Sequence, residues 1–161
     1  MTVILAIDPG SQFTGWAAIS CAPLAYIDSG VISLPKLEFY DRLLILKDQL
    51  IEISAQILPN IIVIEKSFVG INKDASLKIA QIRGAILAVL GSASRTLAEY
   101  SPREAKQLIT GYGAASKDQV AIMIEKLLKR KFNDRLDETD ALALALCHYF
   151  SNKRHFLLKQ S

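Results

Sequence analysis

Short apolar runs alternate with turn-forming residues over the first 35 positions of the chain. Val3 to Ile7 is apolar and rich in β-branched side chains, and residues 8–10 after it read Asp-Pro-Gly, which favours a turn. Phe13 to Ser20 and Leu24 to Leu34 are two further runs that only a few residues separate. Because strands on short connections pair antiparallel, this pattern predicts a three-stranded antiparallel meander.

The hydrophobic period then changes from that of a strand to that of a helix. From Leu37 to Leu58, apolar residues recur every three or four positions, the spacing of an amphipathic helix. The fully apolar stretch Ile61 to Ile64 follows and ends in Glu65, which indicates a buried parallel strand reached by a helical crossover. A polar loop over Ser67 to Asp74 leads to a second helix from Ala75 to Leu90.

The remaining 71 residues are predicted to be mainly helical. We expect a fifth strand from Arg95 to Tyr100, and short helices from Pro102 to Ile109, from Ser116 to about Arg130 and from Asp137 to Phe150. The order of elements predicts an α/β domain with a mixed sheet and helices on its faces. We place this domain at residues 1–150 and treat residues 151–161 as a short basic tail.

Composition excludes several classes of protein. The 161 residues are 51% hydrophobic and 22% charged, close to the globular average, which argues against disorder and collagen-like repeats. Cys21 and Cys147 lie far apart without zinc-ligand spacing, as is typical of a protein from a reducing compartment. No apolar run reaches the roughly 18–20 residues of a membrane span, and the N-terminus lacks a basic signal region. We therefore expect a cytoplasmic protein with no membrane partner.

The net charge of +3 is unevenly distributed along the chain. Residues 1–60 carry three bases and six acids, whereas residues 61–161 carry sixteen bases and ten acids. A basic second half suggests a surface that faces a polyanion. Lysines scattered over a soluble surface would give the same totals, so the charge by itself leaves both interpretations open.

Four carboxylates stand where predicted elements begin or end. Asp8 and Glu65 each follow an apolar strand, at the sheet edge where open α/β folds bind their ligands. Asp137 and Asp140 lie three residues apart, so a helix would project them from one face, where like charges repel unless a cation lies between them. Turn formation, solvated strand ends and helix N-terminal acids are the simpler explanations. Taken together, the acids suit Mg²⁺ or Mn²⁺, which bind through carboxylates and phosphate oxygens.

Four sequence blocks carry a family resemblance. Residues 7–11 (IDPGS), 64–68 (IEKSF), 75–84 (ASLKIAQIRG) and 137–143 (DETDALA) occur in the order and at the separations of the RuvC Holliday junction resolvases, which belong to the RNase H-like superfamily. The likeness runs from Val3 to about His148. It implies an RNase H-like fold, a five-stranded mixed sheet flanked by α-helices, and a symmetric homodimer with the helix around residues 75–90 at its interface.

The resemblance also implies an activity and the residues that carry it. Asp8, Glu65, Asp137 and Asp140 match the family's catalytic carboxylates, which would hold two Mg²⁺ ions per subunit, with Mn²⁺ as a substitute. Each subunit would nick one strand of a four-way DNA junction and leave a 5′-phosphate and a 3′-hydroxyl. The implied partners are the junction, a second copy of the chain and the RuvA and RuvB branch-migration proteins.

Other residues are candidates for contact with DNA. Phe68 matches a family aromatic near the junction bases, and an aromatic side chain on a polar loop can stack on an unpaired base. Lys106 and Lys117 match family basic residues near the active site, where they would bind phosphate or stabilise transition-state charge. Arg83 is a further candidate for a phosphate contact.

Two other functions compete with the nuclease. Actin-like and sugar-kinase ATP-binding proteins also open with an Asp-x-Gly turn after a first strand, but this chain is short for their paired domains. A junction-binding module without catalysis would not need the acids. Nucleotide binding and the effect of magnesium on nicking would separate these possibilities.

Overall fold

The computed structural model describes residues 1–66, 72–132, 136–153 and 156, with only the backbone of residues 136 and 137. Strands β1 (Val3–Asp8), β2 (Phe13–Cys21) and β3 (Leu24–Ser33) form the predicted antiparallel meander. Strand β4 (Ile61–Glu65) pairs parallel with β1, and β5 (Thr96–Tyr100) pairs parallel with β4. The sheet order is β3-β2-β1-β4-β5, so the predicted mixed five-stranded sheet is confirmed.

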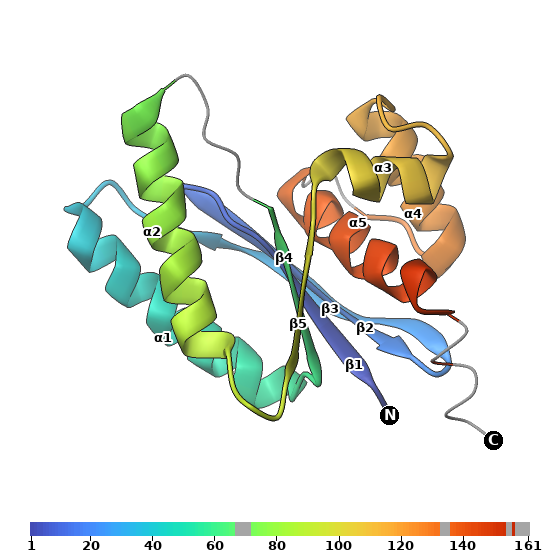
Figure 1. The fold of residues 1–161 in the computed structure, drawn as a ribbon, viewed down its shortest axis with the longest axis horizontal. Helices are drawn as coiled ribbons and strands as arrows, with labels where there is room; N and C mark the ends of the chain where they lie inside the picture. Colours follow the sequence, from blue (N-terminus) through green and yellow to red (C-terminus); the bar gives the residue numbers. More distant parts are fainter. Residues whose placement is uncertain (67–71, 133–135, 154–155, 157–161) are drawn as a thin grey trace.

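Helices cover both faces of the sheet (Figure 1). Helices α1 (Phe39–Ile57) and α2 (Lys73–Leu90) pack on one face. On the other face, helix α5 (Leu136–Ser151) lies across the sheet, and α3 (Pro102–Thr110) and α4 (Lys117–Leu128) pack beside it. The predicted helices are confirmed, with boundaries that differ by two residues or fewer at most ends.

The central strands separate two hydrophobic cores. Ile4 and Ala6 of β1 point to the face that α3, α4 and α5 cover, whereas Leu5 and Ile7 point to the face of α1 and α2. Side chains alternate between the two faces of a strand, so a strand with helices on both faces must be apolar at every position. This arrangement explains why the sequence of β1 is a continuous apolar run.

The predicted tail contains one residue that belongs to the core. Phe156 is buried, and its ring stacks on Tyr149 of α5 with the ring centroids 5.9 Å apart. The sequence predicts a short basic tail over residues 151–161, because a single aromatic in a basic segment gives no periodic signal. Both cysteines are buried and unpaired, and no described helix is long and apolar enough to cross a membrane.

Candidate active site

The register of the parallel strands brings two of the predicted acids together. Ile7 of β1 pairs with Ile64 of β4, and each is followed directly by an acid. Asp8 and Glu65 therefore end neighbouring strands at the same edge of the sheet, the edge where α/β folds bind ligands.

The turn after Asp8 is tied to the next strand. The hydroxyl group of Thr14, a fully buried side chain, donates to the carbonyl oxygen of Gly10 at 3.2 Å and accepts from its N–H at 3.4 Å. A Cβ atom at Gly10 would lie only 1.9 Å from the carbonyl oxygen of Phe13, so no other residue fits this turn. The turn holds Asp8 at a defined position beside β2.

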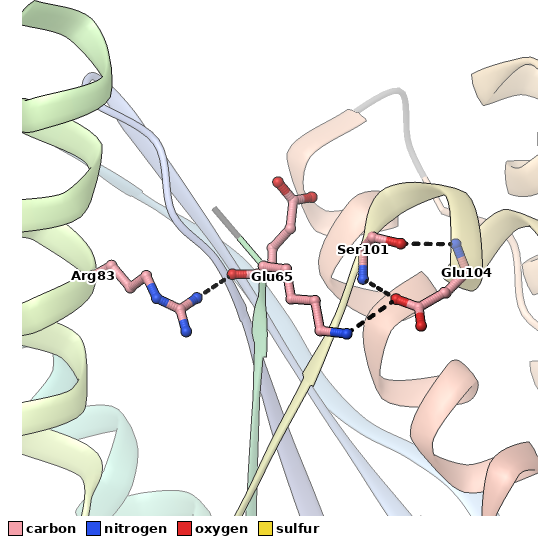
Figure 2. Close-up of polar contacts among 5 residues, drawn as sticks. Glu65, Arg83, Ser101 and Glu104 are labelled. Atoms are coloured by element: carbon pink, nitrogen blue, oxygen red, sulfur yellow. Dashed lines mark hydrogen bonds and ion pairs between the residues drawn. The ribbon is translucent and has the colours of Figure 1, made fainter. Parts of the chain in front are cut away.

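Arg83 of α2 fixes the end of β4 from the face of the sheet that α1 and α2 cover. Its guanidinium group donates to the carbonyl oxygen of Glu65 (Figure 2). The same group forms an ion pair with Glu99 of β5. These contacts join α2 to the ends of two neighbouring strands. Arg83 therefore positions the backbone of Glu65, while its predicted contact with DNA stays a prediction.

A network of hydrogen bonds fixes the start of α3 beside Glu65. The carboxylate of Glu104 accepts from the N–H of Ser101 at 2.7 Å, and the Ser101 hydroxyl accepts from the N–H of Glu104 at 3.2 Å (Figure 2). This capping box lowers the pKa of Glu104, mainly through the backbone N–H of Ser101. Lys66, which follows Glu65, reaches Glu104 at 3.6 Å. The S-x-x-E spacing of residues 101–104 is the sequence signal of this capping box, which is absent from the sequence-based predictions.

A cavity of about 290 Å³ lies between the ends of β1 and β4 and the helices α3, α4 and α5. Its charged lining comprises three acids, Asp8, Glu65 and Asp140, and two bases, Lys106 and Lys117. The rest of the wall is formed by Pro102, Ala105, Val120, Ala143 and Leu144. Five of the residues that the sequence singled out therefore meet in one cavity.

Lys117 balances part of the negative charge in this cavity. Its Nζ atom lies 2.5 Å from Oδ2 of Asp140. Burial raises the pKa of Glu65, the nearby charge of Asp140 raises it further, and Lys117 lowers it. Glu65 and Asp140 thus lie close enough to interact electrostatically, and Lys117 stabilises the charged form of Glu65.

Three predicted residues are not placed in the cavity. Asp137 lies in the first turn of α5, but its side chain is outside the described residues, and so is all of Phe68. Arg83 contacts the backbone carbonyl of Glu65 and does not line the cavity. Glu138, which separates the two aspartates, accepts a hydrogen bond from Ser29 of β3 at 3.2 Å.

The donor set fits a hard divalent cation. Mg²⁺ and Mn²⁺ prefer carboxylate oxygens, and three carboxylates line this cavity. Among the side chains that the structure describes, no three His, Cys, Asp or Glu residues already stand at metal-ligand spacing. Instead, the ammonium group of Lys117 contacts an oxygen of Asp140, the kind of oxygen that a metal ion would take as its ligand.

Known sequences of one protein family resemble this chain over most of its length. A family model described as crossover junction endodeoxyribonuclease RuvC matches residues 4–148. A protein of that name from Tolumonas auensis is 40% identical over 150 residues, which are 92% of this chain and 87% of that protein. Another of that name, from Legionella pneumophila, is 41% identical over 162 residues, 99% of this chain and 92% of that protein.

Solved structures share the fold. The structure of Thermus thermophilus RuvC has a TM-score of 0.83 at 25% sequence identity and covers 96% of this chain and 98% of its own. The same organism's RuvC in complex with a Holliday junction substrate has a TM-score of 0.84 at 23% identity, with 97% and 98% covered. At that identity, the second likeness concerns the fold alone.

Proposed function

This chain belongs to the RuvC family of crossover junction endodeoxyribonucleases, and from that membership we propose that it resolves four-way DNA junctions at the cavity of Asp8, Glu65 and Asp140. The observation that carries the proposal is the meeting of these three acids with Lys106 and Lys117 at one end of the sheet. Acids held beside bases suit a metal-dependent attack on a phosphodiester, since the acids bind cations and the bases bind phosphate.

The proposed roles follow from the chemistry of each group. Asp8, Glu65 and Asp140 would hold two Mg²⁺ ions per subunit, with Asp137 as the fourth carboxylate. When bound, such ions would activate the attacking water and stabilise the leaving oxygen. Breakage of the bond between phosphorus and the 3′ oxygen would leave the 5′-phosphate and 3′-hydroxyl that the family resemblance implies. Lys106 and Lys117 would bind the scissile phosphate and stabilise its transition-state charge. Phe68 would stack on a base near the junction point.

The competing functions have less support. An ATP-binding protein of the actin-like or sugar-kinase type needs two domains around its nucleotide, whereas the five described strands form one sheet. A non-catalytic junction-binding module gives no reason for three acids to line one cavity, because acids repel DNA. The cavity therefore favours the nuclease.

Junction cleavage in the presence and absence of Mg²⁺ tests the proposed function. We expect the wild-type protein to nick a synthetic four-way junction at two symmetric positions when Mg²⁺ is present, and to bind the junction without nicking it when EDTA is added. A linear duplex of the same sequence is the control and should stay uncut. Equal cleavage with and without the metal would refute the proposal, and so would equal cleavage of the duplex.

Paired nicking requires two active sites, and we propose that α2 forms the homodimer interface. Its buried face holds Ile82, Ile86 and Leu90, and the opposite face exposes Leu77, with 61% of its surface accessible. A Cβ atom at Gly84 would meet no atom within 4 Å, so another surface can approach the helix closely there. RuvA and RuvB would act with the dimer in the cytoplasm, as partners that the family resemblance implies.

Replacing Leu77 by Asp tests the interface. We expect the sedimenting mass to fall from that of two chains to that of one chain of 17.7 kDa, because a charge desolvated in an apolar contact is costly. Paired nicks should then become rare single nicks. Ile122→Asp is a matched control, because Ile122 is an exposed apolar residue of α4 in the other helical layer. A dimer that survives Leu77→Asp would place the interface elsewhere.

A further inference from the structure

A second hollow, with a volume of about 580 Å³, adjoins the candidate active site. It lies between α3 and the turn that follows this helix, and its lining includes Arg103, Gln107 and Tyr112. We call it the Arg103–Tyr112 groove. Pro102 and Lys106 line both the groove and the cavity of the three acids. A ligand that extends from the cavity along α3 would therefore enter the groove.

The turn that carries Tyr112 is held at several points. The side-chain amide of Gln107 accepts from the N–H of Gly113 at 2.9 Å and donates to the carbonyl oxygen of Gly111 at 2.7 Å. The hydroxyl group of Thr110 accepts from the N–H of Tyr112 at 3.1 Å. Despite this fixed backbone, 63% of Tyr112 is exposed. The turn thus presents an aromatic ring on a rigid support, which lowers the entropic cost of binding through that ring.

The groove is also basic. A Cβ atom at Gly113 would lie 2.9 Å from Cγ of Arg103, so the stem of this arginine lies close against the turn. Among the described residues, the ion pairs involve neither Arg103 nor Lys106. Glu104, the acid next to Arg103 in the sequence, accepts instead from the N–H of Ser101 and pairs with Lys66. Two cations therefore line the groove without an ion-pair partner there.

We propose that the Arg103–Tyr112 groove binds the DNA strand that flanks the scissile phosphate, with Arg103 on a neighbouring phosphate and the ring of Tyr112 stacked on an unpaired base. This inference rests on the proposed function, because it needs a DNA strand in the adjoining cavity. Two cations and an exposed aromatic on a fixed turn are the groups that proteins use to bind single-stranded nucleic acid. An acidic peptide would satisfy the cations but would give Tyr112 no extended flat partner.

Five variants test the groove, three in it and two on α1 as controls. Arg103→Gln removes one charge from the groove, and Lys47→Gln removes one from α1 on the opposite face of the sheet. Tyr112→Ala removes the groove's aromatic ring, and Tyr40→Ala removes an exposed ring from α1. The affinity for a synthetic four-way junction is measured by fluorescence anisotropy in EDTA at several salt concentrations. Thermal unfolding confirms that each variant is folded, as expected for exposed positions.

Arg103→Gln should weaken binding and reduce the slope of log K against log [salt] by about 0.7–0.9, the contribution of one phosphate contact. Tyr112→Ala should weaken binding by roughly 5- to 150-fold, the equivalent of one stacked base, at an unchanged salt slope. Tyr112→Phe keeps the ring and should bind like the wild-type protein. Both α1 variants should also bind like the wild type.

Two outcomes would overturn the proposal that the groove binds DNA. In the first, Arg103→Gln and Tyr112→Ala bind with wild-type affinity and salt slope. In the second, Lys47→Gln and Tyr40→Ala weaken binding as much as the groove variants do. If the wild-type protein still cleaves the junction in Mg²⁺, either outcome leaves the proposed function intact. A wild-type protein that cleaves no junction would instead refute the proposed function. The proposed role of the groove, which rests on that function, would then fall as well.

Discussion

Replacing Asp8 by Asn is expected to slow junction cleavage by at least about 100-fold and to leave junction binding within a fewfold of wild type. Asn keeps the shape of the side chain but removes the charge that holds a divalent cation. Mutation of groups that only support a metal ligand costs about 10- to 100-fold, so loss of a ligand itself should cost more. Single-turnover nicking at saturating enzyme measures the rate, and anisotropy in EDTA measures binding.

Asp48→Asn is the matched control for this substitution. Asp48 lies on α1, is 66% exposed and pairs with Lys47, so the same change of charge occurs far from the cavity. We expect this variant to cleave the junction at the wild-type rate. A cleavage rate for Asp8→Asn within tenfold of the wild-type rate would show that Asp8 is not a catalytic residue. Equal losses of rate in both variants would show that the effect comes from net charge.

The strands and helices could be predicted from the sequence because each carries a local signal. Val3 to Ile7 and Ile61 to Ile64 are apolar at every position, as a strand between two helical layers requires. Their parallel pairing then brings Asp8 and Glu65 to one edge of the sheet. This half of the site therefore follows from local pattern and general topology.

The other half depends on long-range packing that no local pattern encodes. Asp140 reaches the cavity because α5 lies across the sheet, and Lys106 and Lys117 reach it because α3 and α4 pack beside α5. The sequence pattern predicts these helices but not the direction in which each runs. The sequence pattern singled out Asp140 by its spacing from Asp137, and the family resemblance added the two lysines. The packing of the helices gives a physical account of their proximity.

Individual polar partners were the least predictable feature. The sequence makes Arg83 a candidate for a phosphate contact, yet in the structure it joins α2 to the Glu65 carbonyl and to Glu99. Charge totals cannot distinguish a cation that faces solvent from one that ties helix to sheet, since both add equally to the sum. The same limit applies to Phe156, whose burial depends on where the end of α5 lies.

Lys117→Gln is the second substitution with a large expected effect. At saturating Mg²⁺ we expect the single-turnover rate to fall by roughly 100- to 1,000-fold, the cost of removing one preorganised donor to transition-state charge. We also expect Mg²⁺ to bind more tightly, because the ammonium group no longer competes for Oδ2 of Asp140, 2.5 Å away. The rise in unfolding temperature with Mg²⁺ concentration measures that binding without relying on activity.

Lys126→Gln provides the control on the same helix, since Lys126 is exposed in the last turn of α4. It should change neither the rate nor the Mg²⁺ dependence of unfolding. A rate for Lys117→Gln within threefold of wild type would contradict its role on the phosphate, and an unchanged Mg²⁺ affinity would contradict its competition with the metal. The two measurements separate the two roles proposed for Lys117. It would neutralise Asp140 before a metal ion binds, and it would stabilise phosphate charge once Asp140 is a metal ligand.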